Sequence, residues 1–152
     1  MLGTYHLIAA AMFGVFIAFD MIGRARSFPD VPYWRAKGMF FTLAYFAVAT
    51  YSPLLWDTFL GQYQLLNGSA WPFAVQVVVG FLFYEFLIYA WHRTMHRYQP
   101  LWRWFHQMHH SAERVDIWGA YFFHPFDMIG WALLGSFALL LGVGLTPEAT
   151  LV

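Results

Sequence analysis

The chain has 152 residues, of which 61% are hydrophobic, 22% are aromatic and only 11% are charged. Eight basic residues balance eight acidic ones, so no net charge attracts nucleic acid, and we expect no nucleic-acid partner. No cysteine is present, which excludes disulfides and thiolate metal sites and leaves imidazole and oxygen atoms as the available metal ligands.

Four apolar stretches each approach the ~20 residues that a helix needs to cross the hydrocarbon core of a membrane. In chain order they cover residues 2–19, 39–56, 73–91 and 128–145. The first lacks the basic start and the small-residue cleavage site of a secretory signal, so we interpret it as a retained helix. The sequence therefore predicts one all-α membrane domain over residues 1–152, an integral membrane helical bundle with about four transmembrane helices.

Basic residues are concentrated in two of the connections between these stretches. They are Arg24, Arg26, Arg35 and Lys37 before the second stretch, and Arg93, Arg97, Arg103 and Arg114 after the third. The loop 57–72 holds none. The positive-inside rule then places the first and third connections in the cytoplasm and the loop 57–72 on the other side.

Histidine is concentrated in one segment, because residues 92–110, HRTMHRYQPLWRWFHQMHH, hold five of the seven histidines. Side chains four residues apart lie on one face of a helix, so His92 and His96 can reach a common metal ion. Three further histidines follow at helical spacing and form a second face. They are His106, His109 and His110.

Pro100 lies between the two groups of histidines and disfavours a continuous helix. A turn there would fold the two faces toward each other. The stretch LWRWFH has the composition of an interfacial segment, so the predicted metal site lies at the cytoplasmic edge of the membrane. Imidazole ligands suit iron, zinc, copper or nickel, and the residues alone do not choose among these metals.

Several other residues are candidates for supporting roles in this site. Glu85 lies seven residues before His92 inside the third stretch, where an unpaired acid is costly, so it either orients a ligand or pairs with an arginine. Three acids follow the second group of histidines and are either outer-shell partners or solvated loop residues. They are Glu113, Asp116 and Asp127.

The two remaining histidines differ in position. His124, in FFHPFD, is either a sixth ligand or a structural residue before the fourth stretch. His6 belongs to the outer half of the first stretch and is excluded from the site. At the other end of the chain, Thr146 and Pro147 have the pattern of a helix start, so we expect residues 1–152 to be the front portion of a longer protein.

The motifs HRTMH and HQMHH resemble those of the membrane fatty acid hydroxylase and sterol desaturase superfamily. Its members carry an H-x-x-x-H box, an H-x-x-H-H box and a later H-x-x-H-H box. The flanking segments YEFLIYAW and LWRWF also resemble the family, and the specific resemblance covers residues 85–127. The gap of three residues in the first box is unlike the acyl-lipid desaturases, whose first box usually has four.

The resemblance implies a non-haem di-iron oxidoreductase that hydroxylates or desaturates a C–H bond of a membrane lipid, such as a sterol, fatty acyl chain or isoprenoid. It implies molecular oxygen and an external electron donor protein as partners. Zinc, which imidazole ligands also suit, is a substitute for iron. The iron ligands that it implies are His92, His96, His106, His109 and His110, with Glu85 as the acidic residue that orients them and His124 as a sixth candidate ligand.

Two departures from the family pattern are present. Phe122 stands where an arginine is common, which weakens the transfer of a ligand role to His124. No histidine follows His124, so the third box is absent. Five or six imidazoles can surround one metal ion but leave two irons short of ligands, so we expect residues 1–152 alone to have little activity.

Two other functions are compatible with the residues. The first is a non-catalytic metal-binding membrane protein. The second is a membrane haem protein with histidine pairs as axial ligands, although the chain has no C-x-x-C-H attachment motif.

Overall fold

The computed structural model of the chain describes residues 4–23 and 27–151, without the side chains of Tyr5, His6 and Ala9. The expectations for His6, Arg24 and Arg26 therefore lie outside the described residues. All regular secondary structure in the described part is helical, as the sequence predicted.

The long helices are joined by short helical turns. In chain order the elements are α1 (Thr4–Ile22), α2 (Trp34–Tyr51), η1 (Ser52–Leu55), α3 (Asp57–Leu60), η2 (Gly61–Tyr63), η3 (Gly68–Ala70), α4 (Phe73–Arg97), α5 (Gln99–Leu101), η4 (Trp102–His106), α6 (Gln107–His110), η5 (Ile117–Gly119), α7 (Pro125–Gly135), η6 (Ser136–Val143) and α8 (Pro147–Thr150). Both η4 and η6 are π-helical.

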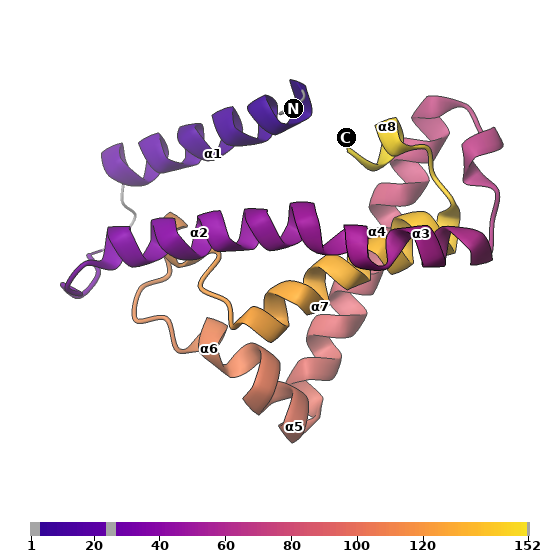
Figure 1. Cartoon of the computed structure of the whole chain (residues 1–152). Helices are drawn as coiled ribbons and strands as arrows, with labels where there is room; N and C mark the ends of the chain where they lie inside the picture. The colour runs from indigo at the N-terminus through magenta and orange to yellow at the C-terminus, as the bar shows by residue number, and fades with distance from the viewer. Residues whose placement is uncertain (1–3, 24–26, 152) are drawn as a thin grey trace.

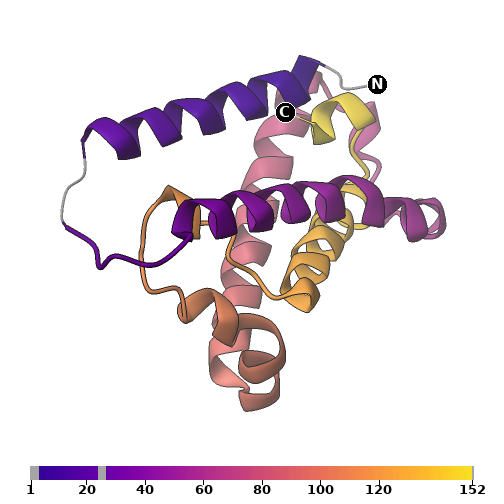
Figure 2. The ribbon, with the colours of Figure 1, turned by 60° about the vertical axis from the view of Figure 1, so that its left-hand side comes forward.

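The centre of the bundle is α7 together with η6. α7 contacts α2, α4 and η4, and η6 contacts α3 and α4. In Figures 1 and 2, α1 lies beside α2 and runs in the opposite direction, whereas α4 crosses α2 and descends to the end of the molecule that carries α5. α7 thus connects the long helices to the turn in which the histidines lie.

Among the described residues, three helices are long and apolar enough to cross a membrane. They are Trp34–Leu55, Phe73–Arg97 and Pro125–Val143. These match three of the four expected spans. The expected first span begins outside the described residues, and within α1 the stretch Ala10–Ile22 is a shorter apolar helix.

Large apolar side chains face outward on these helices, including Phe81, Leu82 and Phe86 of α4. Such a continuous apolar surface is unusual for a protein in water and is expected where lipid is the solvent. The chain is therefore an all-α membrane protein whose exposed surface is largely apolar.

The ends of the helices follow local sequence signals. Gly144 has φ 66°, so it adopts the left-handed conformation that ends η6. Thr146 is the N-cap of α8, and its side-chain oxygen accepts a hydrogen bond from the amide of Ala149 at 3.4 Å. The role of Thr146 was predicted from the sequence.

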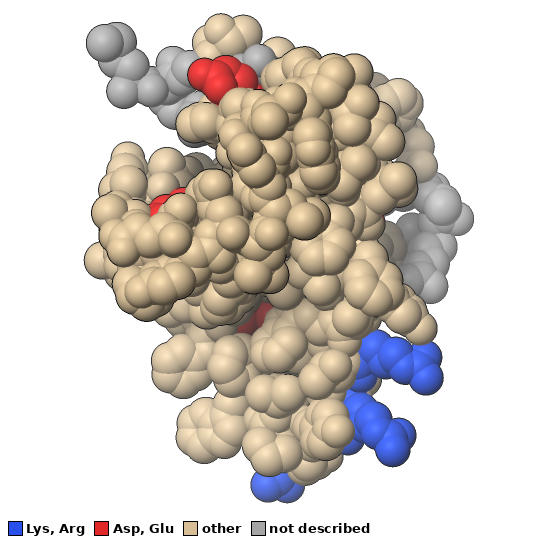
Figure 3. All heavy atoms as spheres, turned by 90° about the vertical axis from the view of Figure 1, so that its right-hand side faces the viewer, with Lys and Arg blue, Asp and Glu red and all other residues tan. Residues whose placement is uncertain are grey.

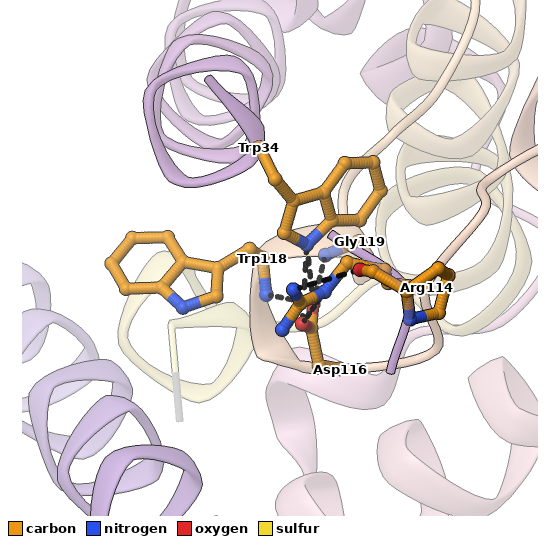
Figure 4. Close-up of polar contacts among 6 residues, drawn as sticks. Trp34, Arg114, Asp116, Trp118 and Gly119 are labelled. Carbon is orange, nitrogen blue, oxygen red and sulfur yellow. Dashed lines mark hydrogen bonds and ion pairs between the residues drawn. The ribbon is translucent and has the colours of Figure 1, made fainter. Parts of the chain in front are cut away.

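Asp116 connects η5 to the start of α2. Its carboxylate accepts hydrogen bonds from the Trp34 indole at 2.9 Å and from the Arg114 Nε at 2.9 Å. It also accepts from the amides of Trp118 and Gly119, at 3.1 and 3.2 Å. Figure 4 shows these donors surrounding the carboxylate. Asp116 is therefore a capping residue with a buried side chain, and its carboxylate makes none of its hydrogen bonds with a histidine.

Gly38 allows the closest approach between α2 and η5. A Cβ atom at Gly38 would lie 2.4 Å from the carbonyl oxygen of Trp118, a backbone atom that cannot rotate away. We expect Gly38→Ala to lower the melting temperature of the purified protein in detergent micelles, because overlap of this kind costs about 1–3 kcal/mol. Gly14→Ala is the matched control, since a Cβ there would meet nothing within 4 Å. Equal melting temperatures for the two variants would contradict the close packing of α2 on η5.

Candidate metal centre

Four histidines converge at the end of the molecule where the chain reverses direction. His92 and His96 lie on the last turns of α4, His106 ends η4 and His110 ends α6. One ring nitrogen from each can be chosen so that all four atoms lie within 4.8 Å of one another. We call this set the four-histidine cluster. It contains four of the five ligands that the sequence predicted in the two boxes.

A break after α4 brings the two groups together. α4 ends at Arg97, because Tyr98 adopts an extended conformation, and Pro100 lies in the first turn of α5. The chain then turns back through η4 and α6, as the lower part of Figure 1 shows. The break that the sequence predicted near Pro100 is confirmed.

The imidazole rings face one another across a small volume. The Nε2 atoms of His92 and His96 are 2.9 Å apart, and those of His106 and His110 are 3.1 Å apart. Across the two pairs, the ring centroids of His92 and His106 are 4.6 Å apart, and those of His96 and His110 are 4.7 Å apart. In each pair one Nε2 donates its proton to the other, and when all four Nε2 atoms are deprotonated their lone pairs face the same small volume.

Tryptophan rings border the four-histidine cluster. Trp102 lies beside His96 and His110, with centroid distances of 5.1 and 5.2 Å. Trp131 of α7 lies 6.4 Å from His92 by the same measure. The two indoles restrict access to the cluster from two directions.

His106 is the most buried member of the cluster, with 1% of its side chain exposed. Its Nδ1 lies 3.0 Å from Oδ2 of Asp127, which is itself 0% exposed and lies in the first turn of α7. The sequence left Asp127 as either an outer-shell partner or a solvated acid, and the structure excludes the solvated position. In the sequence, the feature that indicates a buried role for Asp127 is the position of an acid in the first turn of an otherwise apolar span.

The donor set fits a transition-metal ion. Converging imidazoles are suitable ligands for iron, zinc, copper or nickel when they are neutral. Burial, followed by the neighbouring His106, lowers the pKa of His109 to about 4 and also lowers the pKa of His110. The two imidazoles are therefore neutral at pH 7, and their lone pairs are available to a metal.

His109 lies beside the cluster rather than in it. Its ring packs on Phe123 at a centroid distance of 4.5 Å, and its Nδ1 is buried without a hydrogen-bond partner in the described structure. Its ring centroid is 5.3 Å from that of His106. The structure thus brings His109 next to the four-histidine cluster with one donor atom unused.

The other candidates are not members of the four-histidine cluster. The Nδ1 of His124 accepts a hydrogen bond from the amide of Phe126 at 3.3 Å and so caps α7. Glu85 is exposed on α4 and lines a cavity beside α8. Glu113 is exposed. Neither acid makes a hydrogen bond with a histidine in the described part of the chain.

Basic side chains gather at the same end of the molecule as the cluster. Arg93 and Arg97 of α4 and Arg103 of η4 are exposed there. In Figure 3 the blue side chains lie toward the lower end of the surface, and most of the area above them is uncharged. The arrangement is typical of a membrane protein whose charged end meets lipid headgroups or water.

A cavity of about 490 Å³ lies between α2, α4 and α7. Its lining includes Tyr45 of α2, Tyr84 of α4, and Trp131 and Leu139 of the α7–η6 segment. Because Trp131 also borders His92, this cavity reaches the layer of side chains next to the cluster. Its size falls in the range of pockets that hold small organic ligands, about 300–1,000 Å³.

Comparisons with known proteins agree with this geometry. Over 71 residues the chain is 42% identical to an ornithine lipid hydroxylase from Rhizobium tropici, covering 47% of this chain and 21% of that protein. Over 54 residues it is 37% identical to a sphingolipid C4-hydroxylase from Saccharomyces cerevisiae, covering 36% of this chain and 16% of that protein. The chain thus matches only about a fifth or less of the length of these relatives. No solved structure matches it.

The family model described as fatty acid hydroxylase matches residues 77–152, which is half of the chain. The matched region contains both histidine boxes, the turn that brings them together and Asp127. The resemblance seen in the two boxes is therefore confirmed, and the chain belongs to the fatty acid hydroxylase family.

Proposed function

We propose that this chain forms the front part of an oxygen-dependent membrane lipid hydroxylase. The observation that carries the proposal is the convergence of four imidazoles within 4.8 Å at one end of a membrane helix bundle. Both similar proteins are named as lipid hydroxylases, which favours hydroxylation over desaturation. The proposed substrate is a membrane lipid with an apolar chain.

The proposed metal is iron, held first by His92, His96, His106 and His110. Iron in this position supplies the capacity to reduce oxygen and to oxidise an unactivated C–H bond. Hydroxylation places one oxygen atom of O₂ in the C–H bond and releases the other as water. An external donor protein therefore has to deliver two electrons, and two protons are taken up from water.

We further propose that the centre is a di-iron site and that zinc can replace iron. The unused donor of His109, next to the four-histidine cluster, supports a second ion. Residues 1–152 supply too few further donors for two ions, so the third histidine box of a longer protein would complete the site. We do not assign His124, whose Nδ1 caps α7, or Glu85, which is exposed on α4, a role in this centre.

The chain itself positions the lipid and excludes water. In the proposal, the acyl chain enters the cavity between α2, α4 and α7, where Leu139 and the aromatic rings provide apolar contacts. Trp131 stands between this cavity and His92 and sets how the lipid chain approaches the cluster. Trp102 shields the opposite side. Exclusion of water from this cavity by the bound lipid would limit side reactions.

The proposed orientation places the four-histidine cluster on the cytoplasmic side. The exposed arginines at this end of the chain support it, because basic residues accumulate in cytoplasmic connections. Lipid then reaches the centre from the bilayer, while oxygen and the electron donor reach it from the cytoplasmic side.

The test uses the full-length protein, purified in detergent with its metal content measured. Incubation with membrane lipids, an electron donor and isotope-labelled oxygen gas is expected to give a lipid that carries one labelled oxygen atom. The same reaction without oxygen, or with the His96→Asn variant, serves as the control. Iron-free protein that gives the same product, or labelled product that is absent although iron is bound, would rule out this function.

A non-catalytic metal-binding protein is the second candidate, because the cluster alone accounts for binding and not for turnover. It predicts bound metal, commonly zinc, with no labelled product. Haem is disfavoured by the geometry. Two axial histidines have to lie on opposite faces of a flat macrocycle, whereas four rings here surround one small volume.

A further inference from the structure

His106 is distinct within the four-histidine cluster because both of its ring nitrogens have protein partners. Nε2 faces the Nε2 of His110 at 3.1 Å, and Nδ1 faces Oδ2 of Asp127 at 3.0 Å. Among the hydrogen bonds of the described residues, His92, His96 and His110 make contacts through Nε2 only. Among the four rings, His106 is therefore the one whose second nitrogen is also in hydrogen-bond contact, with Asp127.

The partner at Nδ1 decides where the proton of this ring lies. An ionised carboxylate only accepts hydrogen bonds, so Nδ1 of His106 carries the proton when it donates to Asp127. The lone pair of the neutral ring is then on Nε2, which is the atom that points into the four-histidine cluster. The contact fixes both the tautomer and the direction of the ring.

The surroundings of Asp127 leave its charge without a compensating cation. Asp127 is 0% exposed, and its Oδ1 has no hydrogen-bond partner in the described structure. The ion pairs among the described residues join Asp127 only to His106, while Arg114 pairs with Asp116. A buried carboxylate without a counter-charge is costly, and a cation on the far side of the His106 ring offsets that cost.

We propose that Asp127 is the positioning residue of the metal centre: it holds His106 with Nε2 toward the metal and strengthens the His106–metal bond. The inference rests on the proposed metal centre. It assigns the supporting carboxylate to α7, 21 residues after His106, rather than to Glu85 of α4. Asp127 touches the ligand and not the substrate, so its role is exerted through His106.

A purely structural role for Asp127 makes a different prediction. Asp127 also ties the first turn of α7 to η4, and a structural tie would stabilise the protein whether or not metal is bound. In a positioning role, Asp127 strengthens metal binding, while its buried charge destabilises the metal-free protein. The two roles thus predict opposite effects on the metal-free protein when the charge is removed.

Asp127→Asn separates these roles because it keeps the size of the side chain and removes the charge. The asparagine amide can also turn its NH₂ group toward Nδ1, which favours the tautomer with the proton on Nε2. We expect metal affinity to fall about 10- to 100-fold, the usual loss for a partner of a metal-ligating histidine. We also expect the melting temperature of the metal-free protein to stay the same or rise.

The measurement uses the full-length protein in detergent, stripped of metal by a chelator and titrated with Co²⁺ or Zn²⁺ against a coloured competitor. Asp30→Asn is the matched control, because it removes the same charge at an exposed loop position. Affinity within about twofold of wild type for Asp127→Asn would overturn the inference. A lower metal-free melting temperature with unchanged affinity, or an equal loss of affinity in Asp30→Asn, would overturn it as well.

The wild-type protein provides a second test that does not depend on the folding of a variant. With isotope-labelled histidine and bound Zn²⁺, the nuclear magnetic resonance spectrum is expected to show one Nδ1 proton that exchanges slowly with water, from His106. A spectrum without such a proton would contradict the inference. Wild-type protein that binds no metal would instead contradict the proposed function itself, independently of any comparison of variants.

Discussion

Replacing His106 by asparagine is expected to weaken metal binding more than any other single change in the cluster. The buried ring contributes Nε2 to the four-histidine cluster and is fixed at Nδ1 by Asp127. Loss of a supporting partner costs about 10- to 100-fold in affinity, so loss of the ligand itself is expected to exceed about 100-fold. Equilibrium competition with a chelator, followed by metal analysis of the purified full-length protein, measures this difference.

His124→Asn is the matched control for this experiment. His124 caps α7 through Nδ1 and does not belong to the four-histidine cluster, and asparagine is itself a good N-cap residue. We expect this variant to retain its metal and its stability. His96→Asn repeats the test at an exposed member of the cluster, where folding is less at risk. Equal metal affinity in the His106→Asn and His124→Asn variants would show that the four-histidine cluster is not the metal site.

Asp116→Ala is expected to cause the largest loss of stability. The carboxylate has no exposed surface and accepts hydrogen bonds from two side chains, Trp34 and Arg114, and from two backbone amides. Its removal leaves these donors and the Arg114 charge without their partner. Breaking a buried ion pair by removing one member costs about 3–5 kcal/mol, so the free energy of unfolding should fall by about that amount.

Thermal and chemical unfolding in detergent micelles, with folded protein followed by circular dichroism, measure this loss. Glu113→Ala is the control, because Glu113 is exposed in the same loop and its loss should change stability by less than about 0.5 kcal/mol. Asp116→Asn should fall between the two, since an amide oxygen still accepts hydrogen bonds but carries no charge. Identical unfolding of Asp116→Ala and Glu113→Ala would show that η5 does not depend on this carboxylate.

The helices of the bundle and the approach of the two histidine boxes were predictable because both depend on local sequence. Apolar length predicted α2, α4 and the α7–η6 segment, and the position of Pro100 predicted the reversal that brings His92 toward His106. These features need only the period of the helix and the restriction that proline places on the backbone.

The details of the site were less predictable because they depend on contacts between distant residues. His109 and His110 both follow His106 at helical spacing, and the packing of His109 on Phe123 decides that only His110 joins the cluster. The widened π-helical turn of η4 is not visible in the pattern of residues. Asp127 lies 21 residues from its partner, and no local pattern links the two.

The short separation of the four clustered histidines along the chain has a consequence for the order of assembly. All four lie within residues 92–110, so they leave the ribosome close together, and a chain loop of about 10 residues closes in about 10–100 ns. Asp127 emerges later, with α7. In the proposed centre, an ion captured by the early hairpin would already be present when the carboxylate leaves water. α7 would then close a site that the preceding segment has made.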